Sequence, residues 1–195
     1  MKNLAILIRH GESLANAKNI VSEDLEGHPL TEKGIKQSLK TGGVISPISN
    51  KIEHVYSSPV QRTRETALNV MEAMNLEKTV EIDNLLTETA FGKYNNVKFE
   101  DFPKFHKKEF GIEPFEDNGK RMLHATRKHE GINLYFSHAL PIKALICNLL
   151  ELEEEDASGI KIENASITVI DPFEERVYSI GSLFISEKLI KLIIS

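Results

Sequence analysis

The chain has 195 residues, of which 41% are hydrophobic and 27% are charged, and its formal net charge is −5 at pH 7. This length and composition predict one globular domain, residues 1–195, with a sizeable hydrophobic core. The negative net charge argues against a nucleic acid as partner. Cys147 is the single cysteine, which excludes an intramolecular disulfide. Its apolar neighbours indicate a buried side chain rather than a nucleophile.

No run of apolar residues is long enough to cross a bilayer, and the most hydrophobic run, residues 189–194, is far too short. The first residues lack the basic stretch and the long apolar segment of a signal peptide. We therefore expect a cytoplasmic protein with no membrane partner.

Residues 4–8 are all apolar, which is typical of a strand buried on both faces in a parallel sheet. The run stops at Arg9-His10-Gly11-Glu12, and Gly11 permits a sharp turn or a close backbone approach to a ligand. Ligands of open α/β sheets bind at the carboxyl ends of such strands. Taken alone, His10 fits a structural role. His10 and Glu12 could also bind a metal ion, but the sequence has no second cluster of ligands nearby, which argues against a metal site.

Two helices are expected in the first half of the chain. One follows Thr31, a plausible N-cap, places Ile35 on one face and ends near Gly42, Gly43 and Pro47. A strand at residues 52–58 precedes the other, which starts at Pro59 and continues to about residue 74. Arg62 falls in its first turn, and its buried face is predicted to comprise Val60, Ala67, Leu68, Met71 and Met74.

Residues 79–82 form a short predicted strand, and Glu88 follows it in a polar segment. Residues 93–130 are the hardest part of the sequence to interpret, because Phe99, Phe102, Phe105, Phe110 and Phe115 alternate with lysines. These phenylalanines would line a lid over the site or form the core of a small helical subdomain, and the second interpretation is favoured. An amphipathic helix is expected at residues 117–130. Insertions over a site commonly set specificity, so we expect this segment to select the substrate.

The last third of the chain begins with an apolar strand at residues 132–137 that ends in Ser137-His138. Pro141 is well placed near the start of the following helix, residues 140–152. Residues 164–171 and 176–181 predict a closing hairpin. The apolar positions of residues 183–195 have helical spacing and would pack on the core or on a second copy of the chain, so a homodimer is possible.

Four segments together resemble the histidine phosphatase superfamily, the phosphoglycerate-mutase-like proteins. They are Arg9-His10-Gly11-Glu12, the run Ser57-Ser58-Pro59 followed by Arg62 and Thr66-Ala67, Glu88, and Ser137-His138. The resemblance implies a three-layer α/β/α sandwich with a mostly parallel central sheet. The sequence departs from the family at Ala139, where glycine is usual, and at Asn95-Asn96, where many members have Glu-Gly. If the site needs a positive φ at position 139, that turn would be strained.

The resemblance also implies roles for six residues. His10 would be phosphorylated, Arg9, Arg62, His138 and Asn16 would bind the phosphoryl group, and Glu88 would serve as general acid and base. A neutral imidazole suits attack on a phosphate dianion, and the cationic side chains would neutralise its charge, so no metal or cofactor is expected.

Three functions remain open on these residues. The first is a phosphatase acting on a small organic phosphate ester, the second a phosphoglycerate mutase, and the third a binding module without activity. Mutases of this family that need a cofactor tend to be longer, so the compact chain favours the phosphatase.

Overall fold

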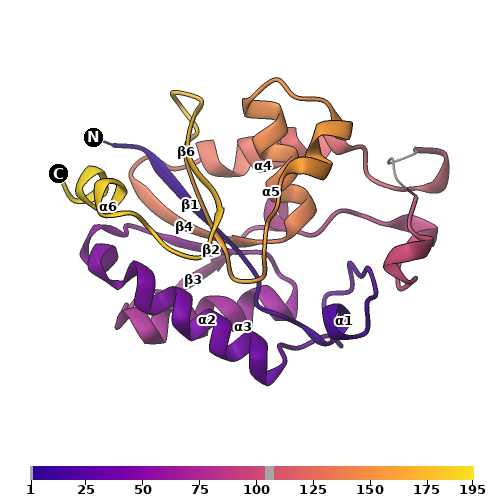
Figure 1. Cartoon of the computed structure of the whole chain (residues 1–195), viewed down its shortest axis with the longest axis horizontal. Helices are drawn as coiled ribbons and strands as arrows, with labels where there is room; N and C mark the ends of the chain where they lie inside the picture. The colour runs from indigo at the N-terminus through magenta and orange to yellow at the C-terminus, as the bar shows by residue number, and fades with distance from the viewer. Residues whose placement is uncertain (1, 104–107) are drawn as a thin grey trace.

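The computed structural model describes residues 2–103 and 108–195 and has a six-stranded sheet at its centre (Figure 1). The strand order is β3-β2-β4-β1-β5-β6, and the bounds are β1 Leu4–Arg9, β2 Val55–Ser57, β3 Val80–Ile82, β4 Ile132–Ser137, β5 Ile167–Asp171 and β6 Arg176–Ser182. The pairs β3–β2, β2–β4 and β4–β1 are parallel, whereas β5 runs antiparallel to both β1 and β6. The predicted mostly parallel sheet and the closing hairpin are therefore confirmed.

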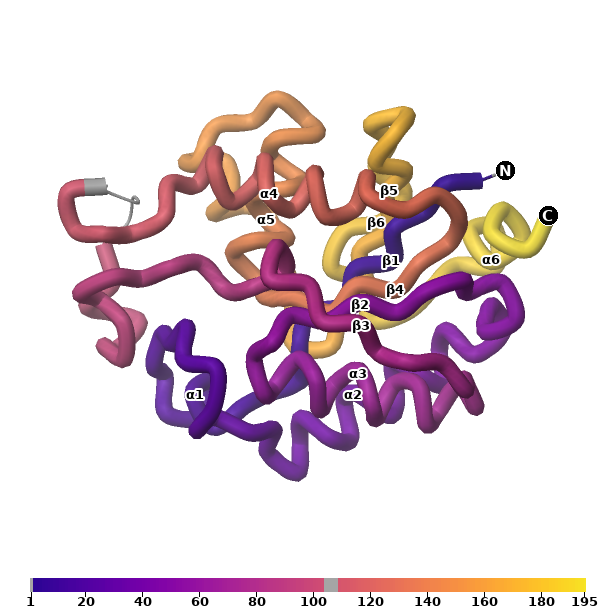
Figure 2. The backbone as a smooth tube through the Cα atoms, turned by 180° about the vertical axis from the view of Figure 1, so that it is seen from behind, coloured from indigo at the N-terminus to yellow at the C-terminus, as the bar shows by residue number. Residues whose placement is uncertain are grey.

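Helices cover both faces of this sheet, with α2 and α3 on one side and α4 and α5 on the other (Figures 1 and 2). The α-helices are α1 Leu14–Ala17, α2 Glu32–Ile45, α3 Gln61–Met74, α4 Phe115–Arg127, α5 Ala139–Leu149 and α6 Glu187–Ile194. Short 3₁₀ helices are η1 Ser46–Lys51, η2 Asn84–Leu86, η3 Gly92–Tyr94, η4 Phe99–Asp101, η5 Lys108–Phe110 and η6 Glu154–Gly159. No helix in the described ranges combines the length and hydrophobicity needed to cross a membrane.

The strand β1 explains why the sheet needs both layers. Leu4, Ile6 and Ile8 belong to the core cluster shared with α2, α3 and α6, whereas Ala5 and Leu7 belong to the cluster shared with α4 and α5. Successive side chains of a strand point to opposite faces, so a strand that is apolar at every position requires cover on both.

Two glycines let the chain pack tightly around α2. A Cβ at Gly11 would lie 2.5 Å from the carbonyl oxygen of Gly34, so the close approach that Gly11 permits is to α2 and not to a ligand. A Cβ at Gly42 would lie 2.4 Å from the carbonyl oxygen of Val70 on α3. The helix continues through both glycines and ends at Ile45, two residues before Pro47, as expected. Gly42 therefore serves helix–helix contact and does not itself end the helix.

Thr31 caps α2 as expected, since its Oγ1 accepts a hydrogen bond of 3.1 Å from the backbone N–H of Gly34. The predicted buried face of α3 is correct except at Leu68, which is 61% exposed. On α2, Ile35 is 40% exposed and lies outside the core.

The phenylalanines of the 93–130 segment have mixed roles. Phe102 makes edge contacts with Phe91 and Tyr94, and Phe115 packs beside α5 in the core of the domain, whereas Phe99 is 65% exposed. The small helical subdomain stays a prediction, since Phe115 packs on the main domain. Phe105 lies outside the described residues. The expected helix begins at Phe115 and ends at Arg127, slightly earlier at both ends than predicted.

The C-terminal helix α6 packs on the core of its own chain. Leu189 and Ile193 are 8% and 2% exposed and belong to the cluster beneath β1. Cys147 is buried and free, as expected. The homodimer stays a prediction.

Candidate active site

His10 follows β1 at the carboxyl end of the sheet, and its backbone is held from two sides. Its N–H donates to the carbonyl of Ser137 over 3.1 Å, extending the β1–β4 ladder by one residue. Its carbonyl accepts from the N–H of Ala165 at 3.1 Å and from Nδ2 of Asn164 at 3.2 Å. Ala165 adopts φ +57°, a left-handed conformation that turns its N–H toward His10. The backbone of His10 is therefore held in place by segments that lie far apart in the sequence.

The hydrogen bonds of the His10 ring define its tautomer. Nδ1 lies 2.7 Å from the carbonyl oxygen of Gly11, which can only accept, so Nδ1 carries the proton. Nε2 is then an unprotonated nitrogen, and Nε of Arg62 donates to it over 3.1 Å. Burial, followed by the charges of Arg62 and Arg9, holds the pKa of His10 well below its usual range. The ring is consequently neutral, and its Nε2 lone pair is directed at Nε of Arg62, at the edge of the site.

Two guanidinium groups border this lone pair. Arg62, in the first turn of α3, donates from Nη2 to the carbonyl of Ser22 over 2.8 Å, and Arg9 donates from Nη1 to the carbonyl of Ile162 over 2.7 Å. Nη1 of Arg62 and Nε of Arg9 are buried and lack a hydrogen-bond partner among residues 2–103 and 108–195. Buried donors are rarely left unsatisfied, so these N–H groups fit an anionic ligand.

His138, the N-cap of α5, lies beside His10 with the ring centroids 5.2 Å apart. Its Nδ1 is 3.1 Å from Nη2 of Arg62, and its Nε2 is 3.0 Å from Oγ of Ser58. Since Arg62 can only donate, Nε2 of His138 carries the proton and donates to Ser58. Ser58 was not singled out for a role, although it belongs to the Ser57-Ser58-Pro59 motif. The turn at Ala139 is not strained, because Ala139 begins α5 and is not among the residues with positive φ.

Glu88 reaches the site from the opposite side. Its Oε1 accepts from the N–H of Thr89 over 3.0 Å, and its Oε2 lies 3.5 Å from Nδ1 of His138 and 3.6 Å from Nη2 of Arg62. Burial raises the pKa of Glu88, although the charge of Arg62 partly opposes this. A carboxyl group with a raised pKa is suited to donate and then recover a proton.

A buried polar cluster behind Glu88 holds its loop against α4. Arg121 donates from Nη2 to the carbonyl of Glu88 over 3.3 Å and from Nη1 to the carbonyl of Leu85 over 2.7 Å. The same guanidinium forms a two-pronged ion pair with Glu113, at 2.6 and 2.9 Å, and contacts Oδ1 of Asn118 at 2.6 Å. Arg121 has no signal in the sequence beyond its position on an amphipathic helix.

Arg9, His10, Arg62 and Glu88 line one cavity of about 340 Å³, whereas His138 lies directly behind them against Arg62. Asn16 also lines it, and the Oδ1 of Asn16 accepts from Ser13 and from Asn164, which leaves its Nδ2 as the donor for a ligand. The structure therefore brings together all six predicted site residues. Asn164, which the sequence placed only at the start of the hairpin, joins them.

The cavity is better suited to an anion than to a metal ion. Ligand atoms of His10, Glu88 and His138 lie within 4.8 Å of one another and could in principle hold a cation. Arg62, however, donates to one nitrogen of each histidine, and a divalent cation there would face its positive charge. Glu12, the alternative partner of His10, instead pairs with Lys33 at 2.6 Å.

A sheet that presents two histidines, two arginines and a carboxyl group at its strand ends is equipped to bind and transfer a phosphoryl group. The chain belongs to the histidine phosphatase superfamily (branch 1), which it matches over residues 5–181. It is similar to the 2,3-bisphosphoglycerate-dependent phosphoglycerate mutase of Thermoplasma acidophilum, with 35% identity and 96% of each chain covered. It is also similar to phosphoserine phosphatase 1 of Hydrogenobacter thermophilus, with 31% identity over 88% of this chain and 87% of that protein.

Solved structures share the fold. A phosphoserine phosphatase mutant from Entamoeba histolytica in complex with phosphoserine has a TM-score of 0.76 at 24% identity, covering 92% of this chain and 97% of that one. Phosphoserine phosphatase from the same organism in complex with 3-phosphoglyceric acid has a TM-score of 0.71 at 25% identity, covering 95% and 98%.

Proposed function

We propose that this protein is a metal-independent phosphomonoester hydrolase that works through a phosphohistidine at Nε2 of His10. The observation that carries the proposal is the unprotonated Nε2 beside buried guanidinium N–H groups with no partner among the described residues. Similarity to phosphoserine phosphatases supports hydrolysis and a small phosphate ester as substrate.

In the first step, Nε of Arg62 exchanges its hydrogen bond to Nε2 of His10 for one to a phosphoryl oxygen. The Nε2 lone pair then attacks phosphorus, and the ester P–O bond breaks. The leaving alkoxide takes the proton of Glu88, and burial, which raises the pKa of this carboxyl, favours the protonated form that the step requires. Arg9 and Arg62 surround the phosphoryl oxygens and stabilise the charge that shifts during transfer. His138 supports them from behind, because its Nδ1 accepts from Nη2 of Arg62 and holds that guanidinium in place. Asn16 adds a neutral donor.

In the second step, the Glu88 carboxylate takes a proton from water, and the hydroxyl attacks phosphorus of the phosphohistidine. The N–P bond breaks, inorganic phosphate forms, and His10 returns to the neutral tautomer held by Gly11. Glu88 is again protonated, so the cycle closes.

The test is phosphate release from phosphoserine and from p-nitrophenyl phosphate in the presence of EDTA. We expect turnover in the wild type, an acid-labile phosphoenzyme, and loss of both in His10→Ala. His124→Ala, which removes an exposed histidine of α4, is the matched control. Release that survives in His10→Ala at the wild-type rate would disprove the phosphohistidine route.

A phosphoglycerate mutase is the second candidate, and one observation favours it. The Thermoplasma relative that carries this name is matched over 96% of both chains, so a compact chain does not exclude a mutase. With 2,3-bisphosphoglycerate added, a mutase would interconvert 3- and 2-phosphoglycerate faster than it releases phosphate. A hydrolase would release phosphate without interconversion.

We further propose a cytoplasmic location and a homodimer. Support for the homodimer comes from Leu183 and Phe184, which precede α6 and are 51% and 68% exposed. Cell fractionation and light scattering of the purified protein test these two proposals.

A further inference from the structure

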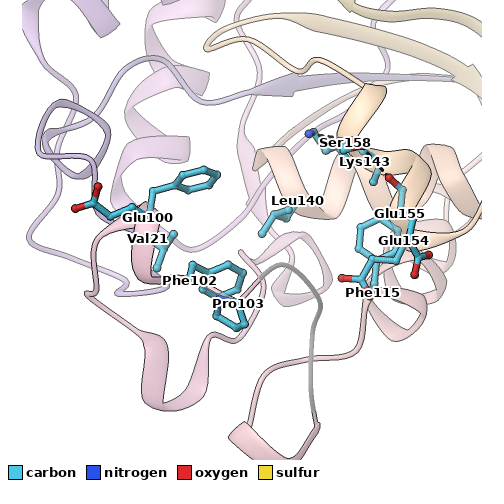
Figure 3. A pocket seen from close by; sticks show the side chains of 12 residues that line it. Val21, Glu100, Phe102, Pro103, Phe115, Leu140, Lys143, Glu154, Glu155 and Ser158 are labelled. Carbon is cyan, nitrogen blue, oxygen red and sulfur yellow. Dashed lines mark hydrogen bonds between the residues drawn. The ribbon is translucent and has the colours of Figure 1, made fainter.

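A second cavity, of about 660 Å³ (Figure 3), lies beside the catalytic cavity. Val21, Phe99 and Leu140 line both cavities, so the two are contiguous. Leu140 follows His138 by two residues on α5, at the junction between the two spaces. A group joined to a phosphate in the catalytic cavity would therefore extend into the second one.

The walls of the second cavity are largely apolar and aromatic. Figure 3 shows Phe102 and Pro103 on one side and Phe115 on the other, with Leu140 between them. The position of Phe99 is fixed by its backbone, because its N–H donates to the carbonyl of Asn19 over 3.0 Å. An exposed aromatic side chain on an anchored backbone, at the mouth of a cavity of this size, is typical of a binding site for a small organic molecule.

Four charged side chains also line the cavity among the described residues. They are Glu100, Glu154 and Glu155, and Lys143 on α5, whose ammonium group donates to the carbonyl of Ala157 over 3.1 Å. The surface that faces the catalytic cavity, at Val21, Phe99 and Leu140, is apolar.

We propose that this second cavity binds the alcohol part of the substrate, and that this part is a bulky, largely apolar group. The inference rests on the proposed function, which it deepens by naming the class of ester. It predicts a preference for esters whose alcohol part is larger and less polar than that of phosphoserine or 3-phosphoglycerate.

The first test compares ethyl phosphate, 3-phosphoglycerate and 2-(2-naphthyl)ethyl phosphate. Ethyl phosphate and naphthylethyl phosphate both release primary alcohols of similar basicity, so the two leaving groups have similar reactivity. A difference in kcat/KM between them therefore reports how well the enzyme binds the alcohol part of the ester. We expect kcat/KM for the naphthylethyl ester to exceed that for ethyl phosphate about a hundredfold, because burying an aromatic ring outweighs the tenfold or greater effect of a single methylene. Values within about threefold, or a preference for 3-phosphoglycerate, would overturn the inference and leave the proposed function standing.

Variants then locate the effect. Phe99→Ala should lower the ratio of the two kcat/KM values at least fivefold, and Ser158→Trp, which fills the cavity from its exposed rim, at least tenfold. Phe173→Ala removes a phenylalanine that is 40% exposed in the turn between β5 and β6, and it should leave the ratio unchanged. Equal ratios in Phe99→Ala, Ser158→Trp and wild type would refute the assignment of this cavity.

Binding to His10→Ala separates this inference from the proposed function. By calorimetry, we expect this variant to bind naphthylethyl phosphate at least tenfold more tightly than inorganic phosphate. If no ester is hydrolysed by the wild type but this binding difference is found, the proposed function fails and the cavity assignment holds. If naphthylethyl phosphate binds no more tightly than phosphate, the cavity assignment fails whatever the enzyme hydrolyses.

Discussion

Arg121 offers a test of whether the loop that carries Glu88 must be held in place for catalysis. Its guanidinium donates to the carbonyls of Leu85 and Glu88 and pairs with Glu113, whose side chain is 18% exposed. Arg121→Met keeps the aliphatic stem but leaves the Glu113 carboxylate without its cation. Breaking a largely buried ion pair costs about 3 kcal/mol. For a chain of this size that lowers Tm by about 6–12 °C.

The effect on catalysis is separable from the effect on stability. Freed from Arg121, the Glu88 carboxyl would shift relative to the leaving oxygen, and a displacement of about 1 Å costs roughly a hundredfold in rate. Arg9 and Arg62 are untouched, so the loss should appear in kcat, with KM within about threefold of wild type. Steady-state kinetics at a temperature below the Tm of the variant measure kcat and KM separately.

Arg127→Met is the matched control on the same helix. Arg127 donates to the carbonyl of Pro172 and pairs with Glu175 at 2.6 Å, where both side chains are about a third or more exposed. Such a pair contributes less than about 1 kcal/mol, and the variant should keep its kcat. If Arg121→Met loses stability but keeps its kcat within about twofold, Arg121 only supports the fold and the reasoning is refuted.

Three further predictions concern proton transfer, the C-terminal helix and the packing of α2. Because burial raises the pKa of Glu88, kcat should fall as the pH rises through that raised value, and Glu88→Gln should lower kcat and remove this limb of the pH profile. Leu189→Ala should lower the free energy of unfolding, measured in urea, by about 2–3 kcal/mol. Ile194→Ala changes a side chain that is 42% exposed and should lower it by less than about 1 kcal/mol. Equal losses would argue against packing of α6 on the core. In Gly43→Ala the new methyl group enters open space, and the variant should stabilise α2 by about 0.5–1 kcal/mol. A Cβ at Gly34 would lie 2.0 Å from a carbonyl oxygen, so Gly34→Ala should destabilise the protein by about 1–3 kcal/mol. Stabilisation by both substitutions would contradict the close contact at Gly34.

Much of the fold was predictable because its signals are local. A strand that is apolar at every position can only be central, and Thr31 followed by Glu32 marks the start of a helix whatever lies around it. Leu68 was predicted wrongly, and the contact made by Gly42 was missed, because the surroundings of both residues depend on tertiary contact. The packing of α2 against α3 decides which face of α3 is buried, and helical periodicity alone does not contain that information.

The residues of the candidate site also fall into those that local sequence signals predict and those that depend on distant contacts. His10, Arg62 and His138 follow strands or begin helices, so the sequence placed them at one edge of the sheet before any contact was known. Glu88 came from the family resemblance, since the polar segment around it has no periodicity. Arg121 was missed because its partners lie up to 36 residues away in irregular chain, where spacing carries no signal.

The position of β1 at the centre of the sheet has a consequence for the newly made chain. Leu4 pairs with Ile132 and Ile8 with Ile167, so β1 gains its neighbours only after most of the domain has been synthesised. At about 5–20 residues per second, roughly six to twenty-five seconds pass before β4, the first partner of this strand, has been synthesised. Contacts so distant in sequence also slow folding, and an unpaired apolar strand is a site of aggregation. The yield of folded protein will therefore depend on how β1 is shielded during translation as well as on the stability of the finished domain.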